Sequence, residues 1–285
     1  MMKHFLHRYS GNTQFEADYN GANYDEPWVS VTDGDASGRV NYNKSEKEKM
    51  LGTPLTFEIT AGGNITWSLY TMNGTFGNAH SAIQYKKNNG EWTNMPRTLS
   101  VAAGDIIEFK GDNPTYGYYD EDEEDITSYD SFSEATTARF ILKGNIMSLI
   151  DSVNFAAATT LVSGYTFAGM FAECTGLTTA ESLELPATAL TEGCYKYMFL
   201  HCASLTVAPE LPAPVLARRC YVQMFDVCSS LAKVTCLATD ITAIFCTQSW
   251  LVSVATSGVF VKNANMEDWG SGSNGIPSGW TVVNA

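Results

Sequence analysis

Positive charge is scarce in this chain. Its 285 residues include 17 Lys and Arg against 31 Asp and Glu, which gives a formal net charge of −14. Nucleic-acid affinity depends on basic side chains that neutralise phosphates, so this balance excludes a nucleic-acid ligand. Long hydrophobic runs are also lacking. Because no apolar stretch reaches the roughly 18 residues of a transmembrane helix, we expect no contact with a membrane.

A secretory signal is missing at the start of the sequence. Residues 1–9 are basic, but they contain no apolar core of about 7 to 15 residues. We therefore expect a chain that stays in the cytosol where it is made, is already mature, or leaves the cell by lysis.

Histidine is rare, and no catalytic motif contains it. None of the four histidines stands in a nucleophile, zinc-protease or phosphate-loop motif. His201 precedes Cys202, but a catalytic thiol needs an exposed, electropositive site, and the repeats described below place this cysteine in a core. Paired carboxylates stay open in so acidic a chain, although glycoside hydrolysis needs them at a fixed separation. We predict no enzyme activity, no catalytic residue and no cofactor.

Cysteine is confined to one half of the chain. All seven cysteines lie after residue 170. An odd number without a secretion signal argues against a disulfide framework. Several are separated by seven residues, whereas zinc knuckles use about two to four. We predict small buried thiols and no metal site.

Residues 1–48 alternate aromatic side chains with Gly, Asn and Asp, and they show neither a helical nor a strict strand period. Their apolar content exceeds that of a free linker. The sequence therefore predicts an extended arm that docks either on its own domain or on a neighbouring subunit. Tyr24, Trp28 and Tyr42 are the candidate contact residues.

In residues 49–145, short β-rich runs are separated by turn residues. Six or seven strands at this spacing predict an antiparallel β-sandwich of the immunoglobulin-like type. Residues 115–138 hold eight acidic side chains and no basic ones. Because like charges repel, we predict a solvated loop there. Calcium binding by this loop stays open, since carboxylates suit the ion but the Asp-x-Asp-x-Asp-Gly ligand order is missing.

The pattern Met-Phe-x-x-Cys-x-x-Leu recurs at residues 170–177, 198–205 and 224–231, with periods of 28 and 26 residues. A fourth, altered copy follows, because adding 26 to Cys220 and Met224 leads to Cys246 and Trp250. This regularity predicts a stack of repeats.

Each copy has its apolar residues at helical spacing. In the second copy, Tyr195, Met198, Phe199 and Cys202 stand at i, i+3, i+4 and i+7, which predicts one short α-helix per repeat, followed by a short strand and a Pro-terminated turn. Burying four such side chains contributes about 6 to 12 kcal/mol, less than the entropy cost of ordering roughly 26 residues. The units must therefore stack as a solenoid over residues 146–285, with irregular terminal copies as caps. Together with the sandwich, this predicts an α+β fold.

The repeats resemble the BspA-like leucine-rich repeats of Bacteroidetes proteins and of phages that infect gut Bacteroidales. The likeness covers residues 144–285 and rests on the lead-in at 144–150, the Cys-Tyr-x-x-Met-Phe-x-x-Cys units and the ending at 275–282. Two departures fall in terminal copies: Thr166 replaces a cysteine in the first, and the fourth has lost Met-Phe.

The arm is similar, through residues 26–30 and 40–44, to the N-termini of structural proteins of Bacteroides-infecting phages, including the crAss-like group. This resemblance implies a virion-surface component, a head fibre or capsid decoration protein. Its arm would anchor to capsid or other virion proteins, and its repeats would contact a host protein or glycan. Phage fibres also imply a homo-oligomer, with a trimer as the expected state. The alternative is a Bacteroidetes cell-surface adhesin with BspA-like repeats.

Because the Met, Phe and Cys of each repeat are expected in the core, binding falls to the variable positions between them. The candidates are Lys196, His201, Arg218, Arg219 and Gln223. Carbohydrate stacking on exposed tryptophan rings is an alternative, although large aromatic residues mostly build cores. The tryptophans concerned are Trp28, Trp67, Trp92, Trp269 and Trp280.

Overall fold

A computed structural model describes residues 28–33, 36–41, 52–122, 125–132 and 136–285. The chain divides into two compact units, Met1–Gly52 and Thr53–Ala285. In the first unit, β1 (Trp28–Asp33) and β2 (Ala36–Asn41) form an antiparallel hairpin in which Trp28 pairs with Asn41. The sequence predicted no strand here, but the Val and Thr residues of β1 favour one. Tyr24 and Tyr42 lie outside the described residues.

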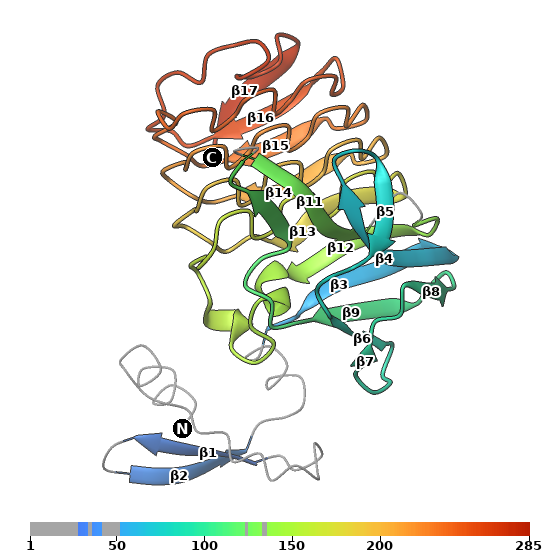
Figure 1. Ribbon diagram of the computed structural model, residues 1–285. Coiled ribbons are helices and arrows are strands. Elements are labelled where there is room, and N and C mark those ends of the chain that lie inside the picture. Colours follow the sequence, from blue (N-terminus) through green and yellow to red (C-terminus); the bar gives the residue numbers. More distant parts are fainter. Residues whose placement is uncertain (1–27, 34–35, 42–51, 123–124, 133–135) are drawn as a thin grey trace. The chain divides into compact units, whose positions relative to one another are not determined.

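Two sheets make up the first part of the second unit (Figure 1). One has the strand order β13-β12-β3-β9-β6-β7, and the other has the order β10-β11-β4-β5, with β8 also paired to β4. The predicted β-rich sandwich is confirmed. Its strands are β3 (Leu55–Ala61), β4 (Gly63–Thr71), β5 (Thr75–Asn78), β6 (Gln84–Lys87), β7 (Thr93–Asn94), β8 (Thr98–Val101), β9 (Ile106–Lys110), β10 (Gly117–Asp120), β11 (Asp125–Phe132), β12 (Arg139–Asn145) and β13 (Leu177–Glu184).

The repeats form a solenoid of parallel rungs, as predicted. Strands β14 (Val207–Leu211), β15 (Lys233–Cys236), β16 (Gly258–Lys262) and β17 (Trp280–Asn284) pair in parallel in that order. Figure 1 shows them stacked along the solenoid, with one coil of chain between successive rungs. Two short 3₁₀-helices, η1 (Ile146–Leu149) and η2 (Phe155–Ala157), precede the first coil.

The predicted helix in each repeat is wrong, and with it the α+β class, because the described residues contain no α-helix and the fold is nearly all β. The Met-Phe-x-x-Cys segments are ribbons of turns. Each ribbon has a left-handed residue at every fourth position, as at Gly193, Tyr197 and His201, where φ is 59°, 61° and 60°. An α-helix cannot contain such residues.

Hydrogen bonding explains why the ribbon replaces the helix. Alternate amides point to the next coil, so Tyr195 N donates to Cys220 O at 3.1 Å and Phe199 N donates to Met224 O at 2.9 Å. The amides between them close turns within the coil, as when Met198 N donates to Tyr195 O at 3.2 Å. A helix would use these groups internally, whereas the ribbon uses half of them to join the coils.

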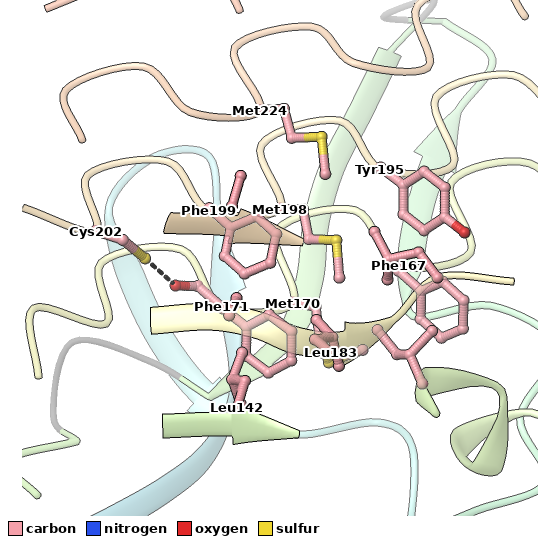
Figure 2. Packing of buried hydrophobic residues seen from close by; sticks show 14 of the residues in the cluster. Leu142, Phe167, Met170, Phe171, Leu183, Tyr195, Met198, Phe199, Cys202 and Met224 are labelled. Atoms are coloured by element: carbon pink, nitrogen blue, oxygen red, sulfur yellow. Dashed lines mark hydrogen bonds between the residues drawn. The ribbon is translucent and has the colours of Figure 1, made fainter. Parts of the chain in front are cut away.

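Aromatic rings from successive coils stack into two columns through the core. In the first, the ring centroids of Phe171, Phe199 and Phe225 are separated by 5.4 Å at each step, and Figure 2 shows the Phe171 and Phe199 rings one above the other. In the second column, Tyr195 stacks on Phe167 at 5.9 Å and on Tyr221 at 6.1 Å. These rings are at most 1% exposed. Because each repeat places its rings at the same positions, the rings of successive coils lie over one another and bury each other.

Both columns begin in the sandwich. Phe132 of β11 stacks on Phe171 at 5.8 Å, and Tyr116 stacks on Phe167 at 6.3 Å. The β12 strand also pairs with β3 on one side and β13 on the other. The expected boundary at residues 145 and 146 thus falls inside the compact unit Thr53–Ala285, and the sandwich covers the open end of the first coil.

Where the structure describes it, the acidic segment is mostly strand and not one long solvated loop. It supplies β10 and β11, which pair antiparallel with a register shift between Tyr118 and Tyr119. Asp130 in this hairpin is 0% exposed and accepts hydrogen bonds from His80 N at 2.9 Å and Ser81 N at 2.7 Å. Backbone amides satisfy the buried carboxylate, and the apolar residues between the charges make the segment a strand.

The ring columns predict a large effect for truncation of one ring. Phe199→Ala removes a fully buried ring that has stacking partners on both sides, so we expect the free energy of unfolding to fall by about 3–5 kcal/mol. Urea denaturation measures this change. Phe245→Ala is the matched control, because Phe245 is 52% exposed and its truncation should cost no more than about 0.5 kcal/mol. Similar losses for the two variants would contradict the account.

Candidate binding site

One corner of the coils gathers charged, aromatic and aliphatic side chains beside the β10–β11 hairpin. We call it the hairpin corner. It consists of Tyr119 and Asp125 from the hairpin and of Tyr165, Glu192, Lys196, Arg218, Arg219, Ile244 and Phe245 from four successive coils.

The coils align these residues through backbone hydrogen bonds. Tyr165 N donates to Glu192 O at 2.8 Å, Gly193 N donates to Arg218 O at 3.0 Å, and Arg219 N donates to Ile244 O at 3.1 Å. Equivalent positions of neighbouring coils therefore lie side by side. These positions form a strip that runs along the coils.

Lys196 is not at an outward position, contrary to the prediction from the repeat. The residue is 2% exposed, and its Nζ donates to both carboxylate oxygens of Asp125, at 2.6 Å from Oδ2. The ammonium also lies 4.7 Å from the centroid of the Tyr197 ring. Burial lowers the pKa of Lys196 because it disfavours the charged form. Lys196 thus joins the acidic hairpin to the coils and is not free to contact a ligand.

Tyr165 is the centre of a second set of contacts in the hairpin corner. Its ring stacks on Tyr119 at 5.5 Å, and its hydroxyl donates to Glu192 Oε1 at 3.3 Å. The same carboxylate oxygen lies 3.1 Å from Arg218 Nη1. Burial raises the pKa of Tyr165 to about 12, so the phenol stays a hydrogen-bond donor at neutral pH. Gly193 is required beneath this ring, because a Cβ there would lie 2.2 Å from Tyr165.

The outer part of the hairpin corner is open to solvent. Tyr119 is 47% exposed, Ile244 is 63% exposed, and 49% of the Arg218 side chain is exposed. Phe245 adds an exposed ring with φ at 58°, in the left-handed region that a bulky side chain rarely adopts. Aromatic residues and arginine are enriched at protein interfaces, and exposed apolar residues that lie together mark interaction sites.

Two other predicted residues, His201 and Gln223, have contact partners that are not part of the hairpin corner. His201 Nδ1 lies 2.8 Å from Glu173 Oε1, and Gln223 Nε2 donates to Asp226 Oδ2 at 2.9 Å. Arg219 belongs to the hairpin corner. Burial opposes its charge, but a hydrogen bond with Tyr165 and the neighbouring Asp125 and Glu192 carboxylates outweigh this effect and raise its pKa. The structure describes only the backbone of Trp28.

Most tryptophans are unavailable for sugar stacking. Trp67, Trp269 and Trp280 are at most 7% exposed. Trp92 is half-buried, with Lys86 and Lys110 ammonium groups 5.2 and 4.6 Å from its ring centroid. Trp67, Trp269 and Trp280 therefore belong to the core, as expected for large aromatic side chains.

Sequence reasoning missed the hairpin and the apolar part of the corner. Tyr119 and Asp125 lie in the segment predicted to be a loop. Ile244 and Phe245 could have been found, because adding the repeat period of 26 to Arg218 and Arg219 leads to them.

The thiols form part of the core. All seven are buried and none is in a disulfide. Cys202 Sγ donates to Phe171 O at 3.0 Å (Figure 2), and Cys228 Sγ repeats this contact with Phe199 O at 3.0 Å. Burial raises the pKa of Cys194 and of Cys236 to about 12, whereas a reactive cysteine needs a lowered pKa. Among the described residues, no group of three or more His, Cys, Asp and Glu side chains is arranged to hold a metal ion.

Comparisons with protein-family models, with curated proteins and with solved structures returned no match to the chain. In the part of the chain that the structure describes, no helix has the length and apolar character needed to span a bilayer.

The buried thiols predict a loss of stability in alkali. Unfolded thiols ionise near their ordinary pKa of 9.0, whereas folded Cys194 and Cys236 keep their protons up to about 12. The folded state then binds more protons, so stability is complete below pH 9 and falls as the pH rises, by about 1.4 kcal/mol per pH unit for each fully ionised thiol.

Urea denaturation between about pH 8 and pH 10 measures this slope. In the Cys236→Ala variant the free energy of unfolding should fall less steeply with pH, by the contribution of one thiol, because the other six thiols remain. Stability that does not change with pH, or rapid modification of folded thiols by a thiol reagent, would contradict the account.

Proposed function

We propose that this chain is a non-enzymatic structural and binding protein of a phage particle, a head fibre or capsid decoration protein with BspA-like repeats. Its N-terminal segment anchors it to capsid or other virion proteins, and the coils display the hairpin corner at the virion surface. The phage setting rests on the resemblance of the N-terminal segment and the repeats. The immunoglobulin-like character of the sandwich belongs to the same proposal.

The observation that carries the binding role is the exposed strip Tyr119, Arg218, Ile244 and Phe245. It combines the Tyr119 ring of β10 with a guanidinium group, a ring and an aliphatic side chain of two neighbouring coils, and tyrosine and arginine are enriched in binding hot spots. The coils are held by backbone hydrogen bonds between strands and between turns, so little backbone conformational entropy is lost when a partner binds. A protein or glycan of the host surface is the partner that we propose.

Two further features support a protein without enzyme activity. The seven thiols are packed in the core, and the His201 imidazole pairs with the Glu173 carboxylate. The division into Met1–Gly52 and Thr53–Ala285 also supports separate roles. The small unit anchors, and the large unit presents the site.

Two assays test where the protein resides. Mass spectrometry of purified phage particles should detect the chain, and washed host envelopes should lack it. Detection in envelopes alone would replace the virion proposal by the alternative, a Bacteroidetes cell-surface adhesin. Deletion of residues 1–48 should abolish incorporation into particles, and unchanged incorporation would place the anchor elsewhere.

Binding to host cells tests the hairpin corner. Arg218→Glu and Phe245→Ala should each weaken binding of the labelled protein at least about tenfold, since loss of a hot-spot residue costs about 2 kcal/mol or more. Lys233→Ala is the control, because the Lys233 side chain is 44% exposed and pairs with Glu181 on the strand side of the coils. Equal binding by all three variants would exclude the corner as the contact site.

A further inference from the structure

The exposed part of the hairpin corner carries apolar surface beside negative charge. Ile244 and Phe245 of the fourth coil are 63% and 52% exposed, and Tyr119 of β10 is 47% exposed. Beyond β10 the hairpin turns through two exposed acidic residues, Glu121 and Asp122, which we call the tip carboxylates. These two kinds of surface decide which class of partner suits the site, an inference that rests on the binding role proposed above.

The cations of the hairpin corner already have partners within the chain. Lys196 Nζ donates to Asp125 Oδ2 at 2.6 Å. Arg218 Nη1 lies 3.1 Å from Glu192 Oε1, and a hydrogen bond within the corner holds Arg219. No ion pair between described residues includes either of the tip carboxylates. The charge that this surface leaves unpaired is therefore negative, and it lies at the tip of the hairpin.

Unpaired negative charge selects a partner that carries positive charge. Opposite charges steer association, and like charges placed together across an interface disfavour it. Lys and Arg side chains supply cations on protein surfaces, whereas the sugars of cell-surface glycans are mostly neutral or carry carboxylate, sulfate or phosphate groups. The tip carboxylates therefore favour a protein partner over a glycan.

The aliphatic surface leads to the same choice. A sugar hydroxyl that lies against the Ile244 side chain loses its water without gaining a hydrogen bond, which costs free energy. An apolar side chain of a protein is stabilised at the same place, because both surfaces leave water. The rings of Tyr119 and Phe245 can stack on either class of partner, so Ile244 is the residue of the strip that discriminates between them.

We infer that the hairpin corner binds a protein segment with apolar side chains over Ile244 and Phe245 and with Lys or Arg side chains at the tip carboxylates. Tyr119 lies between the two contacts, since it precedes the tip and its ring stacks on Tyr165 of the first coil at 5.5 Å. The first and fourth coils are about 15 Å apart, which is three spacings of about 4.8 Å. An extended segment of about five residues spans this distance.

Charge reversal at the hairpin tip tests the cationic contact. The double variant Glu121→Lys, Asp122→Lys should bind intact host cells at least about tenfold more weakly than the natural chain at low ionic strength, because attraction becomes repulsion. The difference should shrink at about 0.5 M salt, which screens exposed charges. The matched control is Glu184→Lys with Glu210→Lys, because both residues are exposed on the strand side of the coils and the net charge changes equally. Equal binding by the two double variants overturns the inference.

Treatment of the host cells separates the two classes of partner. Digestion of the cell surface with proteinase K should abolish binding of the full natural chain, whereas periodate oxidation of surface sugars should leave binding unchanged. Binding that survives the protease, or that is lost after periodate, identifies a partner other than a protein segment and overturns the inference. The proposed site fails separately: it is excluded if Arg218→Glu and Phe245→Ala bind as the natural chain does, and it stands if both weaken binding whatever the class of partner.

Discussion

Stacking of aromatic rings along the coils is the interaction on which the rest of the structure depends. The Phe171, Phe199 and Phe225 rings are in contact at 5.4 Å, and each ring is covered on both faces only because its neighbours are present. A coil cannot bury its own rings, so a single repeat cannot fold. The end of the stack must be covered by something else, and Phe132 of β11 does this at 5.8 Å from Phe171. The sandwich is therefore the cap of the solenoid as well as a layer of its own.

The sequence supported correct predictions wherever burial alone decided the outcome. Met198, Phe199 and Cys202 are in the core as their repetition predicted, and the thiols are buried. The prediction of a helix was wrong because a turn that repeats every four residues also places apolar side chains at i and i+4 on one side of the chain. The left-handed conformation of Tyr197 and His201 could not be predicted from the sequence, because glycine is the residue that usually signals it and neither position is glycine. Its cause is the hydrogen bonding between coils, which becomes visible only when they are side by side.

The sequence predicted only the part of the candidate site that follows from the repeat pattern. Arg218 and Arg219 were found as variable positions of the repeat. Lys196 was assigned to the surface because its partner Asp125 lies 71 positions away in sequence, in a segment whose charge run suggested a loop. The hairpin that carries Asp125 contacts Tyr165 of the first coil and Lys196 of the second, and it leaves later coils open. Its position thus separates the buried Lys196 from the exposed part of the hairpin corner, where we place the contact with a partner.

The sandwich and the solenoid share one hydrophobic core, so we expect them to unfold together. Differential scanning calorimetry of the full chain tests it most directly. The account predicts one cooperative transition for Thr53–Ala285, with calorimetric and van't Hoff enthalpies that agree. Two separated transitions, assigned by hydrogen exchange to residues 53–143 and 144–285, would contradict it.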